Sequence, residues 1–358
     1  MLNANPLVPN TLRSVLRYLL FGCVALVIAL ALVATAVPTT CNAQTCPQPA
    51  ASGRQPFPSE LAPSFDQAGL NNLGSSGPGQ ARLWSGYPIN RNGNANHRAY
   101  APCILLKAIG YTEVTGWFQF NVSTYGSIGN TYTSADCGYG IMQITSGMND
   151  GLGGLFSPSR VAAEPVYNIG TGTLILQRKW NGIIFDFDHN IGQNDPMIVE
   201  NWYYAVWAYN GFGYINNPNN PRFPWPRSSW QCGQDGQTRA NWPYQELIWG
   251  CAANPPTYQS GGQAIAFWGP MALTLPNRSL ISNPPPQYID TPQNHHYSCG
   301  WDFLPIILKH EAPTPTPTST ATRTPTRTNT PFSTPTPTRT PTRTPTCLPG
   351  CPQGYPPP

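Results

Sequence analysis

The stretch that decides the fold begins with ILLKAIGYTEVTGWFQFN, residues 104–121, and continues after a polar spacer with CGYGIMQIT, residues 137–145. Pro102 precedes the first part and suits the first turn of a helix, so the apolar run predicts a short helix over Ile104–Val114. Its single acid, Glu113, stands at the end of that run. Burial raises the pKa of a carboxyl group, and a carboxyl that keeps its proton at neutral pH can act as a general acid. Glu113 is therefore a candidate catalytic residue, and a surface glutamate at a helix end is the alternative.

The composition limits the class of protein. Charged residues make up 9% and aromatic residues 11% of the 358 residues, with 42 prolines and 33 glycines. Such a chain is too apolar to be wholly disordered and too rich in Pro and Gly to be uniformly folded. The net charge of +4 arises in the tail, where no acid follows Glu311 and the basic residues are Arg323, Arg327, Arg339 and Arg343. The near-neutral body contains eleven tryptophans, which does not indicate nucleic-acid binding.

The first 43 residues have the features of an export signal. Arg13 and Arg17 precede an uncharged apolar run over Tyr18–Val37, and Cys41–Ala43 offers a small-residue cleavage site. The run is also long enough to span a bilayer, so an N-terminal membrane anchor is the alternative to a cleaved signal peptide. Both alternatives predict a secreted or cell-envelope protein.

The cysteines agree with an exported protein. The chain has ten, and cleavage after Ala43 would leave eight, an even number that favours disulfides in an oxidising compartment. Spacing does not determine the connectivity, but it suggests three pairs: Cys103 with Cys137, Cys232 with Cys251, and Cys347 with Cys351.

No metal or other cofactor is predicted. His295, His296 and Cys299 lie close together in the sequence, but no second pair of ligands stands at the spacing of a zinc site. A phosphate-binding glycine loop before a basic helix is also missing from the sequence.

Changes in composition divide the chain. Residues 44–96 show no sustained periodicity and predict an irregular linker, after which a folded domain is expected over 97–310. Residues 311–346 form a Pro-Thr repeat that predicts a disordered, extended stalk, and 347–358 form a short Cys- and Pro-rich tail.

The folded domain is expected to be mainly α-helical, within an α+β class. Apolar residues at helical spacing predict helices over Asn168–Trp180 and Glu200–Asn210. Residues 118–137 suit loops or a small hairpin, and Gly138–Met148 suits a turn that leads into a short helix. A core over 97–215 would then be followed by a loop-rich extension.

The core resembles the soluble lytic transglycosylase family, which has a lysozyme-like fold and acts on peptidoglycan. The resemblance covers about a third of the chain and rests on four short motifs in the family's order. They are Ala108-Ile109 leading to Glu113, Gly140-Ile141-Met142-Gln143, Asn168-Ile169-x-x-Gly172, and Ala208-Tyr209-Asn210-Gly211.

One position departs from the family pattern. The family usually has a serine directly after its catalytic glutamate, whereas Val114 follows Glu113 here. Counting forward from Ala108 places Glu113 at the catalytic position, and counting backward from Trp117 places Val114 there. We adopt the forward register because no other acid lies nearby.

The resemblance implies a reaction and its residues. Glu113 would be the general acid and base that cleaves the bond between N-acetylmuramic acid and N-acetylglucosamine, with a 1,6-anhydro product. Tyr209 would hydrogen-bond to Glu113, Gln143 and Asn210 would contact the sugars, and Met142 would form part of the cleft wall. The expected partner is a peptidoglycan glycan strand, bound by a monomer.

Two other functions remain open at this stage. In a lysozyme-type hydrolase a second carboxylate would position water, and Asp136 and Asp150 flank the Gly-Ile-Met-Gln motif. In a non-catalytic cell-wall protein the domain would bind glycans and the stalk would tether it. The absence of serine after Glu113 favours this last alternative.

Overall fold

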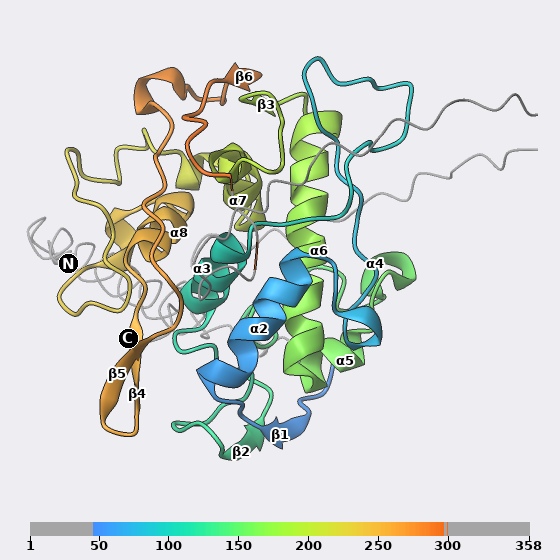
Figure 1. Cartoon of the computed structure of the whole chain (residues 1–358), viewed down its shortest axis with the longest axis vertical. Helices are drawn as coiled ribbons and strands as arrows, with labels where there is room; N and C mark the ends of the chain where they lie inside the picture. The colour runs from blue at the N-terminus through green and yellow to red at the C-terminus, as the bar shows by residue number, and fades with distance from the viewer. Residues whose placement is uncertain (1–45, 297–298, 300–358) are drawn as a thin grey trace, which may run out of the picture. The chain divides into compact units, whose positions relative to one another are not determined.

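The computed structural model describes residues 46–296 and Cys299, and these residues form a mixed helix and strand structure with more helix than strand (Figure 1). The α-helices are α2 (Pro58–Gly69), α3 (Cys103–Glu113), α4 (Gly151–Gly154), α5 (Pro158–Ala163), α6 (Pro165–Asn181), α7 (Tyr203–Tyr209) and α8 (Tyr244–Ala253). Short 3-10 helices are η1 (Gly74–Ser76), η3 (Val199–Trp202), η4 (Tyr214–Asn216), η5 (Arg239–Asn241) and η6 (Arg278–Leu280), and η2 (Gly182–Asp186) is a π-helix.

Three two-stranded sheets accompany the helices. The antiparallel pairs are β1 (Ser52–Arg54) with β2 (Ile128–Asn130), and β4 (Thr257–Ser260) with β5 (Gln263–Ala266); the parallel pair is β3 (Asn190–Ile191) with β6 (Tyr288–Ile289). Gly53 faces Gly129 in the first pair. A side chain at Gly53 would lie 2.2 Å from the Phe120 ring, so only glycine fits that position.

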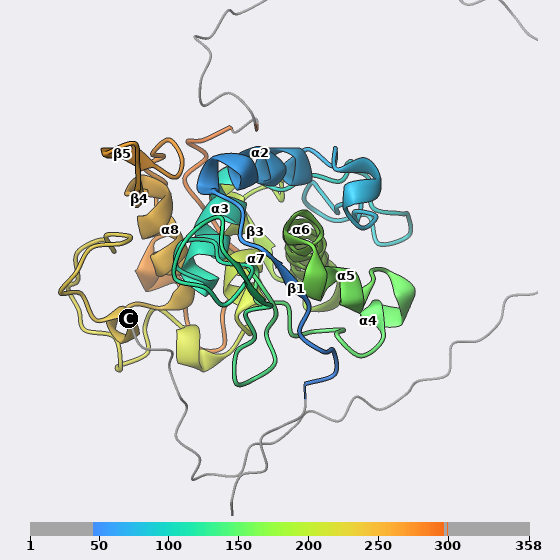
Figure 2. The same ribbon diagram turned by 90° about the horizontal axis from the view of Figure 1, so that it is seen from below.

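Helix α6 is the longest helix of the described residues, and α2, α3, α5 and α7 pack against it. Figure 2 views α6 nearly along its axis, with α2, α3, α5 and α7 close to it. Pro165 begins the helix and two basic residues, Arg178 and Lys179, stand in its last turn. The helix predicted over Asn168–Trp180 is confirmed.

Helix α3 is buried on all sides because other helices enclose it. Every residue from Cys103 to Thr112 is buried, and α2, α6 and α8 surround the helix. The helix ends at Glu113, because Val114 is extended and Gly116 has a positive φ of 82°. The predicted helix over Ile104–Val114 is confirmed to within one residue at each end.

The prediction of an irregular linker over 44–96 is wrong for residues 58–69, which form α2. Pro58 begins this helix, and the Glu60 carboxylate accepts a hydrogen bond from the Phe57 N–H at its start. Leu61 and Phe65 are buried in the core, and the Phe65 ring lies 4.5 Å from that of Trp117. A second proline, Pro63, lies within the helix and made its apolar pattern read as a loop in the sequence.

Residues 198–210 follow the prediction, and residues 138–148 do not. The helix expected over Glu200–Asn210 is present as η3 followed directly by α7. Gly138–Met148 forms turns and bridges but no helix. Gly140 and Gln143 both have positive φ, at 62° and 45°, which is incompatible with a continuous right-handed helix.

Three disulfides connect the described residues: Cys46–Cys137, Cys103–Cys299 and Cys232–Cys251. The predicted Cys232–Cys251 pair is confirmed, and the predicted Cys103–Cys137 pair is wrong. Cys103 begins α3 beside Gly69, where the sulfur of Cys299 also lies, so the partner of Cys103 comes from the C-terminal segment. Cys137 pairs instead with the segment that leads into β1.

Several predictions concern residues outside the described part of the chain. These are the signal peptide or anchor over 1–43, the stalk over 311–346, the tail over 347–358 and the Cys347–Cys351 pair. Within residues 46–296 and Cys299, no helix combines the length and the apolar character needed to cross a bilayer.

Candidate active site

Glu113 lies where α3 meets α8. It is the last residue of α3, and its side chain is partly buried. The Tyr244 hydroxyl donates a hydrogen bond to Glu113 Oε1 over 2.5 Å. Among the described residues, no group bonds to Glu113 Oε2.

Tyr244 is held in place by the start of α8. Pro243 precedes it in an extended conformation that begins the helix. In the same first turn Glu246 accepts a hydrogen bond from Arg227 Nε over 2.7 Å, in a buried ion pair. The Cys232–Cys251 disulfide ties the preceding loop to the last turn of α8. These contacts fix the phenol in front of Glu113.

The surroundings of Glu113 raise its pKa. Burial is the largest cause because it disfavours the carboxylate, and the negative charge of Asp136 acts in the same direction. The Tyr244 hydrogen bond and the positive charge of Arg239 oppose this rise without cancelling it. Arg239 is held close by its hydrogen bond to the Thr112 carbonyl, 2.6 Å from Nη1. Glu113 thus holds a proton more strongly than an exposed glutamate does.

The turn over residues 140–143 is held by two of the other motif segments. Asn168 on α6 accepts a hydrogen bond from the Met142 N–H over 2.8 Å, and its amide donates to the Tyr139 carbonyl over 2.7 Å. From α7, the Tyr209 hydroxyl donates to the Met142 carbonyl over 2.9 Å. A side chain at Gly172 would lie 2.6 Å from Met142 Cε, so glycine allows the turn to approach α6 this closely.

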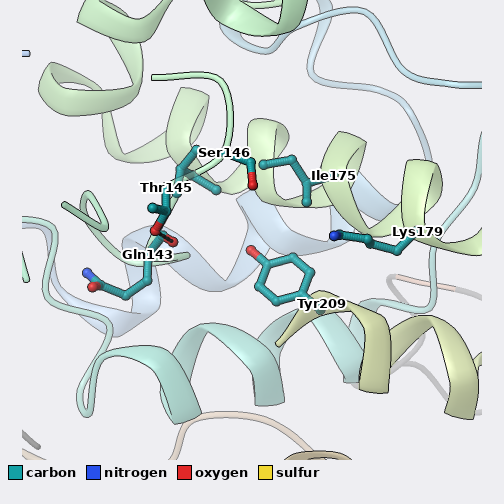
Figure 3. Close-up of a pocket in the computed structure, with 7 residues that line it drawn as sticks. Gln143, Thr145, Ser146, Ile175, Lys179 and Tyr209 are labelled. Atoms are coloured by element: carbon teal, nitrogen blue, oxygen red, sulfur yellow. Dashed lines mark hydrogen bonds between the residues drawn. The ribbon is translucent and has the colours of Figure 1, made fainter. Parts of the chain in front are cut away.

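A small pocket opens beside this turn (Figure 3). Its volume is about 70 Å³, and the residues that line it are Gln143, Ile144, Thr145, Ser146, Ile175, Lys179 and Tyr209. Glu113 is not among these lining residues, but its charge acts on one of them. Burial raises the pKa of Tyr209 well above its usual value, and the charge of Glu113 raises it further.

The structure places some of the predicted site residues in the pocket and others outside it. Gln143 and Tyr209 line the pocket. Met142 is completely buried and is not among the lining residues, contrary to the expected place in the cleft wall. Asn210 is exposed after the end of α7, where its Oδ1 accepts a hydrogen bond from Asn216. The hydrogen bond to Glu113 that was expected from Tyr209 comes from Tyr244.

The sequence did not point to Tyr244, Arg239 or Lys179. Tyr244 and Arg239 lie in the loop-rich extension, outside the resemblance, and approach Glu113 only through the packing of α8 on α3. An aromatic segment around Trp242–Trp249 was visible in the sequence, but nothing distinguished its tyrosine from a packing residue.

The two aspartates named for a hydrolase are in different situations. Asp136 is exposed and accepts a hydrogen bond from Ser134 Oγ, and its charge acts on Glu113. Asp150 caps α4 by accepting a hydrogen bond from the Leu152 N–H over 2.9 Å. Only Asp136 is therefore in electrostatic contact with Glu113.

The histidine and cysteine cluster has other partners. Cys299 is in a disulfide, and His295 Nδ1 lies 2.5 Å from the buried carboxylate of Glu200. Within the residues that the structure describes, no three His, Cys, Asp or Glu side chains come together as metal ligands would.

Comparison with known proteins does not add to this picture: no protein-family model matches the chain, and neither does any curated protein or any solved structure.

Proposed function

We propose that this protein is a peptidoglycan lytic transglycosylase with a lysozyme-like domain, in which Glu113 is the general acid and then the general base. The observation that carries the proposal is the environment of Glu113, a carboxyl with a raised pKa whose Oε1 is held by Tyr244 and whose Oε2 has no partner among the described residues. The hydrogen bonds of Met142 to Asn168 and Tyr209, which join three of the motif segments, and the action of the Glu113 charge on Tyr209 support the same function.

In the first step, the protonated Oε2 of Glu113 gives its proton to the glycosidic oxygen between N-acetylmuramic acid and N-acetylglucosamine. The bond from that oxygen to C1 of the muramic residue breaks, and N-acetylglucosamine leaves with a free hydroxyl. The N-acetyl group of the substrate stabilises the positive charge at C1, so this step does not need a second enzyme carboxylate.

In the second step, the carboxylate of Glu113 removes the proton from the C6 hydroxyl of the same muramic residue. The C6 oxygen bonds to C1 and closes the 1,6-anhydro ring, which restores the protonated glutamic acid. Tyr244 supports both steps because its hydrogen bond stabilises the carboxylate that forms after the first. Its own pKa is raised well above the usual value by burial and by Glu113, so it stays a donor.

A lysozyme-type hydrolase is the second candidate, because the charge of Asp136 reaches Glu113. In that reaction water would attack C1 and the product would carry a reducing end. The peptidoglycan partner and a location outside the cytoplasm belong to the proposal as well, and three disulfides support an oxidising compartment.

Digestion of purified peptidoglycan tests the proposal. The wild-type full chain should clear a suspension of cell walls, and Glu113→Gln should not. No clearing by either protein would favour a non-catalytic glycan-binding protein, and equal clearing by both would remove Glu113 from the mechanism. The products, identified by mass, then separate a transglycosylase from a hydrolase.

A further inference from the structure

Lys179 has an unusual place for a lysine near a helix end. It lies in the last turn of α6, is partly buried, and lines the pocket together with Gln143 and Tyr209. Burial alone lowers the pKa of its ammonium group. No hydrogen bond or ion pair of Lys179 is found among the described residues, so this desolvation is not offset by a protein carboxylate.

The neighbouring Arg178 shows what an ordinary cation at this helix end looks like. It stands in the same turn and is exposed to solvent, where it can interact favourably with the helix C-terminus at little desolvation cost. Interaction with the helix end therefore accounts for Arg178 but does not explain why Lys179 is turned into a pocket.

The other lining groups suit an anion rather than a cation. Thr145 and Ser146 are exposed and bring hydroxyl groups, and Ile175 is apolar. The side-chain amide of Gln143 points away from Lys179 and donates to the Gly140 carbonyl over 2.9 Å (Figure 3). No acidic residue lines the pocket. Figure 3 shows Lys179 and Tyr209 on one side of the pocket and Thr145 and Ser146 on the other.

We infer that this pocket binds a carboxylate group of the substrate, with Lys179 as its cation and the hydroxyls of Thr145 and Ser146 as donors. The volume of about 70 Å³ has room for a carboxylate. The pocket shares Tyr209 with the surroundings of Glu113, so the carboxylate would belong to a residue close to the cleaved bond. Lys179 would then decide which glycans are substrates.

The inference rests on the proposed function for the identity of the glycan. N-acetylmuramic acid carries a lactyl group whose carboxyl is free in strands without peptides and joined to the stem peptide in others, and that peptide has carboxylates of its own. A polymer of N-acetylglucosamine has no carboxylate. The shared chemistry is thus a carboxylate near the muramic residue, from either source.

Calorimetric titration in a Glu113→Gln background tests the site without turnover. The ligands are peptide-bearing glycan strands, strands stripped of peptides by an amidase, and neutral chitooligosaccharides. Lys179→Met removes the charge, Lys179→Arg keeps it, and Arg178→Met removes the neighbouring charge as a matched control. Thermal unfolding of each variant checks that it is folded.

Lys179→Met should weaken binding of a carboxylate-bearing strand about ten- to hundredfold, because hydrogen bonds to charged groups are strong. Binding of chitooligosaccharides should not change, and Lys179→Arg should retain most of the affinity. Arg178→Met should change the affinity less than about twofold, because Arg178 is exposed and does not line the pocket. Loss on stripped strands assigns the lactyl carboxylate, and loss on peptide-bearing strands assigns the stem peptide.

Two results would overturn the inference while the proposed function stands: equal affinity of Lys179→Met and its parent for every strand, or an equal loss on neutral and carboxylated ligands. If the parent binds none of the three glycans, the proposed function fails together with the inference.

Discussion

Two regions of the molecule meet at Glu113, and they are built differently. In the core of residues 97–215, the buried amide that joins the motif segments has a partner for its oxygen and for its nitrogen. This amide belongs to Asn168, which accepts one hydrogen bond and donates two. In the extension, the amide of Gln245 on α8 is equally buried, but its Oε1 has no hydrogen-bond partner among the described residues. The extension nevertheless supplies Tyr244, the group in direct contact with Glu113.

The two regions therefore contribute to the site in different ways. The core holds the turn over residues 139–142 through hydrogen bonds to its backbone, and the extension adjusts the proton affinity of Glu113 through Tyr244 and Arg239. Damage to the core should therefore affect stability, whereas changes in the extension should affect the pH dependence of the reaction.

The largest expected effect is that of Glu113→Gln. Loss of a general acid and base should lower the rate of peptidoglycan cleavage by about 10²- to 10⁴-fold. The control is Glu164→Gln, the same change in a partly exposed residue that pairs with Arg160. Rates of soluble fragment release should show normal activity for the control. A Glu113→Gln variant as active as the control would contradict the account.

The next largest effect is expected on the free energy of unfolding, when the buried amides of Asn168 and Gln245 are removed in turn. Asn168→Ala removes three hydrogen bonds and leaves buried backbone groups without partners, so it should lower the free energy of unfolding by about 3 kcal/mol or more. Gln245→Ala removes hydrogen bonds to Tyr203 and Asn216 but also an unpartnered buried oxygen, so its effect should be smaller, about 1 kcal/mol.

Urea unfolding of the two variants measures this difference. A larger loss for Gln245→Ala than for Asn168→Ala would show that the extension, rather than the core, is the more strongly determined region.

Tyr244→Phe should change how the rate of peptidoglycan cleavage depends on pH. The lost hydrogen bond stabilised the carboxylate of Glu113, so its removal raises the already raised pKa further. A general acid works while protonated, so the alkaline limb of the pH–rate profile should move to higher pH. Tyr204→Phe is the control, because its buried hydroxyl has no partner among the described residues. A limb that moves to lower pH, or an equal shift in the control, would argue against the role of Tyr244.

Asp136→Asn should have the smallest effect and the opposite sign. The charge of Asp136 raises the pKa of Glu113, so its removal should move the alkaline limb to lower pH. Asp136 is exposed, so this shift should shrink as salt is added. Asp150→Asn changes a helix cap instead and should leave the profile in place. A shift that does not depend on salt would indicate a direct role for Asp136, as in a hydrolase.

The features that the sequence could predict depend on interactions between residues close together along the chain. Helix α6 was predictable from apolar residues at helical spacing, and α3 from the continuous apolar run that its enclosure requires. The motif resemblance named Gln143 and Tyr209, which line one pocket. Helix α2 was missed because Pro58 and Pro63 resemble loop punctuation.

The rest depends on contacts between distant parts of the chain. Tyr244 approaches Glu113 across 131 residues of sequence, and Cys103 pairs with Cys299 across 196. No local pattern encodes either contact. Asn210, by contrast, follows the family motif in sequence, and the structure places it outside the pocket in a bond with Asn216.

The central claim is that Glu113 donates its proton and then takes one back from the substrate's own C6 hydroxyl. Mass spectrometry of the fragments released from peptidoglycan by the wild-type full chain tests it most directly. The wild-type chain should release 1,6-anhydromuramyl products, lighter by one water than the hydrolytic ones, and Glu113→Gln should release none. Fragments that carry only reducing ends would contradict it.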